Sequence, residues 1–144
     1  MSKKSIILIG GGGHCKSAID VIESEGKYSI IGIIDSPDKI GQMLLGYPII
    51  GTDDDLPQLC KEDFYFLITV GQIKQNKVRK KIFNVIKVNN GKFATIISPT
   101  AHVSHHARVE QGTIICHYAL VNADVTVGQN CIINTRSLIE HDTV

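Results

Sequence analysis

The chain has 144 residues, of which 43% are hydrophobic and 20% are charged, and its formal net charge is +1. This length suits one ordinary domain or two small ones, and the balanced charge argues against a nucleic-acid or membrane-surface partner. The apolar run at residues 6–9 is too short for a membrane span or a signal peptide. The four cysteines form no CxxC pair, so we expect reduced thiols in a cytoplasmic protein.

Apolar runs alternate with helical patterns over residues 1–98, which predicts a Rossmann-like α/β domain with a short parallel sheet. Strands are expected at residues 5–9, 30–34, 49–52, 64–70 and 93–97. Helices are expected before Gly26, over residues 53–59 and before Asn89-Asn90-Gly91. The pattern changes after Ser98, so we divide the chain into residues 1–98 and 99–144.

Four consecutive glycines, Gly10 to Gly13, and then His14 separate the first strand from the first helix. Such a loop offers free backbone N–H groups and the positive end of a helix to an anion, typically a phosphate. The third small residue of the NAD pattern GxGxxG is replaced by Cys15, although Asp35 at the next strand end would suit a ribose. A dinucleotide, a sugar nucleotide and a purely structural turn all remain open at this point.

The last third of the chain repeats with a period of six, which is typical of neither a helix nor a simple strand. Aliphatic residues stand at Val103, Val109, Ile115, Val121, Val127, Ile133 and Ile139. Two residues before each stands a small or slim residue: Ala101, Ala107, Thr113, Ala119, Val125, Cys131 and Ser137. Short strands joined by corners, three to a triangular coil, explain this pattern, so we predict a parallel β-helix of about two coils.

No metal site is expected among the histidines. His105 and His141 share a position in the repeat but stand two coils apart, nearly ~10 Å at the usual strand spacing, too far for one ion. His102, His105 and His106 lie close together but lack a fourth ligand. We therefore interpret these histidines as solvent-facing or interface residues.

Several segments together resemble the NeuD/PglD group of sugar acyltransferases. They are the glycine-histidine loop, the acidic strand end at Asp35, Thr-Val-Gly-Gln at 69–72 with the basic helix behind it, and the hexads that begin at residue 98. The resemblance implies a domain that binds a nucleotide-activated sugar, often UDP-linked, followed by a left-handed β-helix that assembles as a homotrimer. It also implies acetyl-CoA as cosubstrate.

The resemblance carries binding roles onto individual residues of this chain. The nucleotide-sugar residues would be Gly10, Gly11, Gly12, Gly13, His14, Asp35, Gly71, Gln72 and Arg79. The family has asparagine where Gln72 stands, a mild change because both side chains carry an amide. Arg79 either reaches a diphosphate or belongs to a solvated helix face beside two lysines. Asn134 would contact acetyl-CoA.

The family's catalytic histidine lies in an Asn-Thr-x-x-x-Ile-Glu-His-acid segment, which residues 134–142 match. An amine must lose a proton as it attacks a thioester, and an imidazole is a suitable base near neutral pH. The resemblance therefore makes His141 the general base and Asp142 its orienting partner.

We thus expect an acetyltransferase of bacterial surface glycan biosynthesis, with N-acetylation of a UDP-4-amino-4,6-dideoxy sugar as the first choice. The alternatives are O-acetylation of a sialic-acid-like sugar, a non-catalytic sugar-nucleotide binder and an NAD-dependent protein. Family members continue for several more coils, so we also expect this chain to be C-terminally truncated or capped by another chain.

Overall fold

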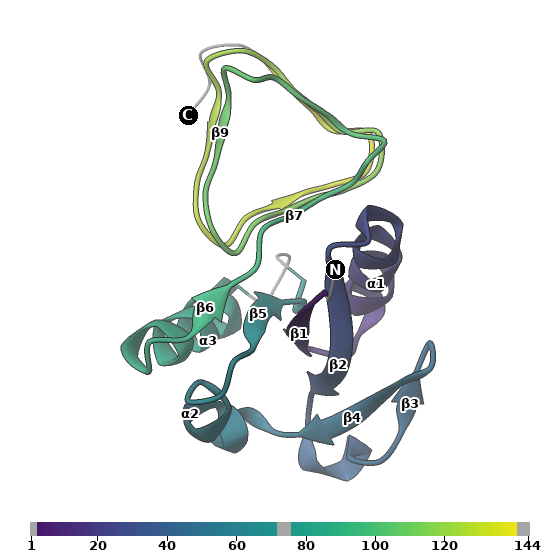
Figure 1. Cartoon of the computed structure of the whole chain (residues 1–144), viewed down its shortest axis with the longest axis vertical. Helices are drawn as coiled ribbons and strands as arrows, with labels where there is room; N and C mark the ends of the chain where they lie inside the picture. The colour runs from purple at the N-terminus through teal and green to yellow at the C-terminus, as the bar shows by residue number, and fades with distance from the viewer. Residues whose placement is uncertain (1–2, 72–75, 141–144) are drawn as a thin grey trace.

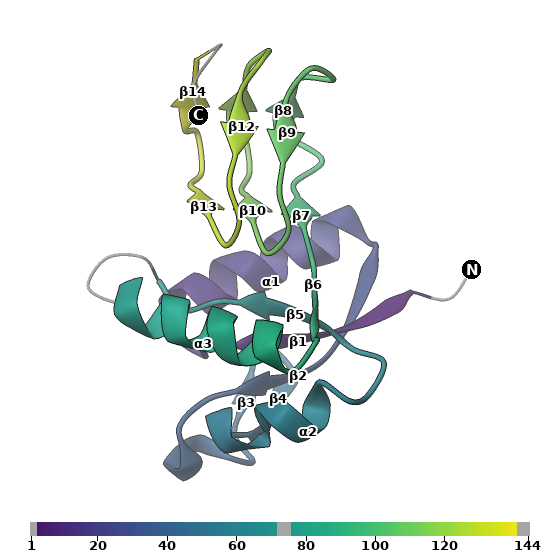
Figure 2. The same ribbon diagram turned by 90° about the vertical axis from the view of Figure 1, so that its left-hand side faces the viewer.

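The computed structural model describes residues 3–71 and 76–140. An α/β sheet with its helices forms one part of the molecule, and a triangular coil of chain forms the other (Figure 1). The two parts lie directly against each other, with α1 between the sheet and the coil (Figure 2).

Apolar runs form the central strands of the sheet, where both faces are covered and every side chain from Ile6 to Ile9 is buried. The strands are β1 (Lys4–Ile9), β2 (Tyr28–Ile34), β3 (Met43–Leu44), β4 (Tyr47–Gly51), β5 (Tyr65–Ile68) and β6 (Lys92–Phe93). In the described residues their order is β3-β4-β2-β1-β5-β6, and all pairs are parallel except β3 with β4. The predicted short parallel sheet is confirmed, and β3 was not predicted.

Helices cover both faces of this sheet. They are α1 (Gly13–Glu25), α2 (Leu56–Leu59) and α3 (Asn76–Val88), with 3-10 turns η1 (Pro37–Lys39) and η2 (Asp53–Asp55). Helix α1 packs on one face through Ala18, Ile19 and Ile22, and α2 and α3 cover the other. Gly26 ends α1 in the left-handed conformation at φ 74°, as its position predicted.

Residues 96–139 form the β-helix, whose strands are two residues long and separated by corners. They are β7 (Ile96–Ile97), β8 (His102–Val103), β9 (Arg108–Val109), β10 (Ile114–Ile115), β11 (Leu120–Val121), β12 (Thr126–Val127), β13 (Ile132–Ile133) and β14 (Leu138–Ile139). Within the described part they form three parallel sheets, β7-β10-β13, β8-β11-β14 and β9-β12. The predicted left-handed β-helix is confirmed. The strand expected at residues 93–97 is instead two strands, because the chain leaves the α/β sheet after β6 and enters the β-helix at β7.

The interior of the prism contains the residues that the hexad pattern selected. Val121 and Val127 pack there with the small corner residues Ala119 and Val125, all buried. Most corners use a left-handed residue, again at intervals of six: Gly112, Tyr118, Asp124, Asn130 and Arg136. A non-glycine residue rarely adopts this conformation, so the surrounding ladders must hold these corners in place.

One face of the prism packs against α1. The sheet β7-β10-β13 lies beside α1 (Figure 2). Its residues Ile96, Ile114 and Ile132 are buried in one core with Ala18 and Ile22 of α1. Each buried isoleucine side chain contributes about 1.5–3 kcal/mol. The β-helix and the α/β sheet therefore share a core.

Glu25, at the end of α1, adds a polar contact to this shared core. Its Oε2 accepts a hydrogen bond from the backbone N–H of Ile97 at 3.2 Å and lies 3.7 Å from Lys27 Nζ. Its Oε1 is buried without a hydrogen-bond partner among the described residues. Burial raises the pKa of the Glu25 carboxyl above the ordinary value of 4.5, against the opposing effects of Ile97 N–H and Lys27.

Glu25→Gln is therefore expected to change how stability depends on pH. Above pH 4.5 the folded carboxyl keeps a proton that the unfolded chain has lost, so the free energy of unfolding falls as pH rises through this window. Glutamine does not titrate, so the wild type should lose stability relative to the variant as the pH rises above 4.5. Chemical denaturation of both proteins measures this difference, and parallel pH curves would contradict it.

Candidate functional site

A cavity of about 770 Å³ opens at the carboxyl ends of β1, β2 and β5. Strand β1 has β2 on one side and β5 on the other, so the strand order changes direction at β1. Open parallel sheets bind ligands at such a switch point. The cavity is lined by Gly10, Gly11, Gly12, Gly13, His14, Asp35, Ser36, Lys39, Thr52, Asp53, Asp54, Thr69, Val70, Gly71, Val78 and Ile82, among others. Sequence-predicted residues from three separate strand ends therefore come together.

The glycine loop fits its place because its first two residues have no room for a side chain. Gly10 adopts φ +116°, and a Cβ on it would lie 2.7 Å from Val70 Cγ2 and 2.9 Å from Val70 N. A Cβ on Gly11 would lie 2.6 Å from Asp35 Oδ2. A Cβ on Gly12 or Gly13 would meet no protein atom within 4 Å. The first two glycines thus serve the packing of the loop, while the next two keep the start of α1 open toward the cavity.

Two polar atoms at this cavity lack a hydrogen-bond partner among the described residues: His14 Nε2 and Asp35 Oδ2, both buried. Asp35 Oδ1 accepts from the backbone N–H of Ser36 at 2.9 Å, and Lys39 Nζ lies 3.6 Å from Oδ2, an ion pair too long for a hydrogen bond. Burial, helped by the nearby Arg79 charge, lowers the pKa of His14 and favours its neutral form. Unsatisfied buried groups are unfavourable, so these atoms are suited to bind a ligand.

The electrostatics of the cavity divide along its length. No side chain caps the N-terminus of α1, and the positive end of this 13-residue helix favours phosphate oxygens. Asp35 and, farther along, Asp53 and Asp54 provide acceptors suited to hydroxyl or amine hydrogens. The arrangement can therefore hold a ligand with an anionic centre and polar ends, as a nucleotide has.

Other predicted site residues do not line the cavity or lie outside the described ranges. Gln72, His141 and Asp142 fall outside the described residues, so their assignments stay predictions. Asn134 is exposed at the corner after β13 and does not line the cavity. Cys15 is fully buried, and burial raises the pKa of its thiol to about 11, so it acts as a core residue rather than a nucleophile.

The structure decides against one of the two interpretations of Arg79. Arg79 is only 2% exposed, so the solvated helix face is wrong for this residue. Its guanidinium donates to the carbonyls of Ile68 and Val70 and to Asn130, and Arg79 does not line the cavity. In this structure the guanidinium donors are directed at protein acceptors, and a contact of Arg79 with a diphosphate stays a prediction.

Several cavity residues were missed by the sequence interpretation. Thr69 fixes the loop by donating from Oγ1 to the Gly10 carbonyl at 2.6 Å. Thr52 and Asp55 form a capping box that shapes η2 beside the cavity. The Thr-x-x-Asp spacing is visible in the sequence as a helix start, but nothing in that spacing indicates its closeness to the glycine loop. Val78 is 41% exposed despite its place in the apolar helix pattern, because it lines the cavity.

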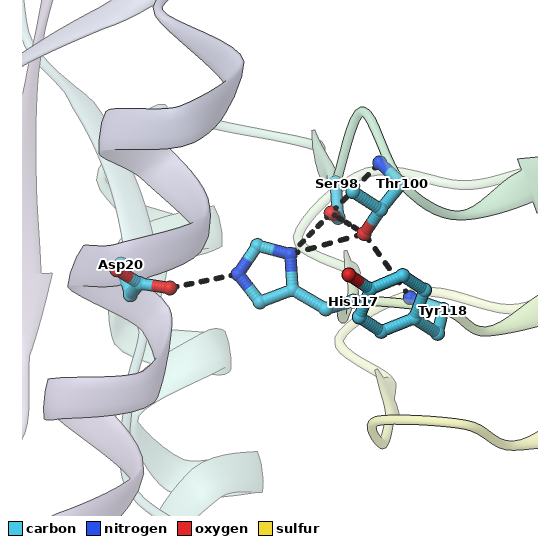
Figure 3. A network of polar contacts seen from close by, with 5 residues as sticks. All are labelled: Asp20, Ser98, Thr100, His117 and Tyr118. Carbon is cyan, nitrogen blue, oxygen red and sulfur yellow. Dashed lines mark hydrogen bonds and ion pairs between the residues drawn. The ribbon is translucent and has the colours of Figure 1, made fainter.

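A second polar cluster joins α1 to the β-helix (Figure 3). His117 Nε2 lies 2.8 Å from Asp20 Oδ2, and His117 Nδ1 lies 2.6 Å from Ser98 Oγ and 3.2 Å from Thr100 Oγ1. The order Asp-His-Ser resembles a hydrolytic triad, but Ser98 is only 1% exposed and its Oγ cannot reach a substrate. The cluster therefore fastens α1 to a corner of the prism.

No group of three or more metal-ligating side chains occurs in residues 3–71 and 76–140. Over the same residues, none of the helices combines the length and the apolar character needed to cross a membrane.

The fold and the site together define a class of protein. A glycine-rich strand-to-helix loop at the switch point of a parallel sheet is the phosphate-binding arrangement of nucleotide-binding α/β domains, and here that domain shares a core with a parallel β-helix. Residues 5–86 match the family model described as the PglD N-terminal domain. The chain belongs to this PglD-like family, which confirms the resemblance noted in the sequence.

Two curated relatives match most of this chain, but the match covers only part of their own length. UDP-N-acetylbacillosamine N-acetyltransferase of Bacillus subtilis is 33% identical over 116 residues, 78% of this chain and 51% of that enzyme. A protein of Acanthamoeba polyphaga mimivirus is 32% identical over 123 residues, 85% of this chain and 23% of that protein. The chain thus spans about half or less of the length of these relatives.

Solved structures resemble the whole of the chain. The acetyltransferase domain of PglB from Neisseria gonorrhoeae, in complex with acetyl coenzyme A, superposes with a TM-score of 0.86 at 30% identity, covering 98% of this chain and 66% of that one. PerB from Caulobacter crescentus, in complex with CoA and GDP-perosamine, gives 0.85 at 29% identity, covering 98% and 65%. Both parts of the present fold therefore occur together, in the same arrangement, in proteins of this kind.

Proposed function

We propose that the protein is an acetyl-CoA-dependent acetyltransferase that acts on a nucleotide-activated amino sugar. The observation that carries the proposal is the cavity at the switch point, where the glycine loop, the buried His14 Nε2 and the carboxylate of Asp35 face one space. The complexes of PglB with acetyl coenzyme A and of PerB with CoA and GDP-perosamine support the two ligands.

The proposed substrate is a UDP-4-amino-4,6-dideoxy sugar, and the proposed product is its N-acetyl form. The diphosphate would bind at the N-terminus of α1, and Asp35 would accept hydrogen bonds from hydroxyls of the nucleoside. The N-acetyltransferase name of the Bacillus subtilis relative supports an amine acceptor and a uridine nucleotide. A guanosine nucleotide, as in the PerB complex, is the alternative that the experiment below tests.

The proposed chemistry is direct transfer with His141 as general base. The sugar amine attacks the thioester carbonyl of acetyl-CoA, His141 takes the amine proton, and the C–S bond breaks. His141 then passes that proton to the leaving thiolate, so CoA is released as its thiol and the imidazole is neutral again. Asp142 would fix the imidazole tautomer, and Asn134 would contact acetyl-CoA.

We further propose a homotrimer in the cytoplasm. The sheet β7-β10-β13 lies against the chain's own α/β domain, whereas β14, two residues before His141, lies on the side of the prism away from it (Figures 1 and 2). A neighbouring subunit would bring a cavity to that side. Tyr118 and Leu138, 63% and 58% exposed, supply apolar surface for such a contact, and the four free cysteines suit a reducing compartment.

The test measures thiol release from acetyl-CoA with UDP- and GDP-linked 4-amino-4,6-dideoxy sugars as separate acceptors. We expect release that depends on the acceptor, with the UDP sugar preferred, and an acetylated amine in the product. Binding of UDP without any acceptor-dependent release would point instead to a non-catalytic sugar-nucleotide binder. Thermal stabilisation by NAD but not by UDP or GDP would contradict the proposal.

A further inference from the structure

Arg79 of α3 joins the end of β5 to a corner of the β-helix that is 51 residues away in sequence. Its Nη1 donates to the carbonyls of Ile68 at 3.1 Å and of Val70 at 2.5 Å, beyond the end of β5. Its Nη2 donates to the carbonyl of Asn130 at 2.9 Å and to the side-chain Oδ1 of Asn130 at 2.6 Å. Asn130 is a left-handed corner of the β-helix, at φ 54°. The planar fork of one guanidinium therefore ties the α/β sheet to the β-helix.

The segment that Arg79 holds is a wall of the nucleotide cavity. Thr69, Val70 and Gly71 line the cavity, and Thr69 Oγ1 holds the carbonyl of Gly10 in the glycine loop. A Cβ on Gly10 would clash with Val70, so the loop and this wall are in close contact. A continuous series of contacts thus runs from Asn130 through Arg79 and the 69–70 backbone to Gly10.

Arg79 is also a buried cation, and its bonds within the described residues go to neutral carbonyl and amide oxygens rather than to a carboxylate. Burying a charge costs its hydration energy, so we expect the charge of Arg79 to provide a compensating interaction. Two gains are conceivable: the span of the fork, or the attraction of the charge for a phosphate. The span of the fork explains the structure better, because all four observed hydrogen bonds use the fork. Attraction for a phosphate needs only a positive charge, which a lysine would provide as well as an arginine.

We propose that Arg79 is a positioning residue, which with Asn130 uses the β-helix to hold the phosphate end of the nucleotide cavity in place. This role rests on the proposed function for the identity of the ligand, but the tether itself does not. Arg79 does not line the cavity, so it acts through Val70 and the glycine loop.

Two substitutions separate the tether from the charge. Arg79→Lys keeps the positive charge but loses the fork that spans β5 and Asn130. Asn130→Asp keeps the acceptor and tolerates the left-handed corner, but it neutralises the cation. Asn130→Gly keeps the left-handed corner and the backbone carbonyl acceptor but removes the side chain with its acceptor Oδ1. It is the milder variant should Arg79→Lys fold poorly. Lys80→Ala, which removes an exposed cation from the neighbouring position of the same helix, is the matched control.

The full-length proteins are compared by hydrogen exchange without ligand and by titration with UDP and GDP. For Arg79→Lys and Asn130→Gly we expect faster exchange at residues 10–14 and 69–71, with residues 28–34 unchanged, and about a tenfold weaker affinity for the nucleotide that binds the wild type. Asn130→Asp and Lys80→Ala should match the wild type in both measurements.

Each of the remaining outcomes contradicts either the tether or the proposed function. Unchanged exchange in Arg79→Lys and Asn130→Gly would overturn the tether. Normal nucleotide affinity in Arg79→Lys together with weak affinity in Asn130→Asp would assign the effect to charge and overturn it as well. Faster exchange in a protein whose wild type binds neither UDP nor GDP would uphold the tether and contradict the proposed function.

Discussion

Replacing Gly10 by alanine is expected to abolish nucleotide binding and to lower the free energy of unfolding by roughly 3 kcal/mol or more. The new Cβ would lie 2.7 Å from Val70 Cγ2, 2.9 Å from Val70 N and 3.1 Å from the Thr69 carbonyl carbon. Two of these atoms are backbone, so no side-chain rotation relieves the clash. The φ of +116° is in addition a conformation that alanine strongly disfavours. Chemical denaturation and titration with UDP and GDP measure the two effects.

Gly13→Ala is the matched control for stability. A Cβ on Gly13 meets no protein atom within 4 Å, and alanine is favoured over glycine in a helix by up to about 1 kcal/mol. We therefore expect a stability equal to or slightly above that of the wild type. If Gly10→Ala unfolded at the same denaturant concentration as Gly13→Ala, the close contact between the glycine loop and Val70 would not exist in solution.

The β-helix was predictable because its period depends on contacts that repeat along the chain. Each inward aliphatic residue stacks on its copy one coil away, so the interval of six is written directly into the sequence, as Val103 above Val121 illustrates. The face that packs on α1 also has a signal in the sequence. Ile96-Ile97, Ile114-Ile115 and Ile132-Ile133 recur at intervals of 18, and the first isoleucine of each pair is the one that packs on α1.

The cavity was predictable only in part, because its members come from separate strand ends. The carboxyl ends of neighbouring parallel strands meet at one edge of a sheet, so Asp35 and Gly71 were expected near the glycine loop and line the same cavity. The role of Arg79 was not predictable by this reasoning. Its partner Asn130 is 51 residues away in the β-helix, and no periodic pattern connects a helix of one part to a corner of the other.

The same limit explains the difference between two histidines at equivalent positions of the hexad. His117 is held by Asp20 and Ser98 at the corner beside α1, whereas His105, at the corner between β8 and β9, is exposed. The repeat places both side chains at corners, but only the packing of α1 decides which corner is covered.

His141→Ala is expected to slow acetyl transfer by about 10²–10⁴-fold, the usual contribution of a general base. Nucleotide affinity should stay within about twofold of the wild type, because the residues that line the cavity belong to the α/β domain. Thiol release from acetyl-CoA and titration with UDP and GDP measure the two quantities.

His105→Ala is the control for this prediction, since His105 shares the hexad position two coils earlier and is exposed. It should transfer acetyl groups at the wild-type rate, so that a loss confined to His141→Ala reports the base and not a general weakening of the prism. Equal turnover in the two variants would remove His141 from the mechanism. Equal loss in both would instead locate the effect in the assembly of the β-helix, because His105 has no part in the proposed proton transfer.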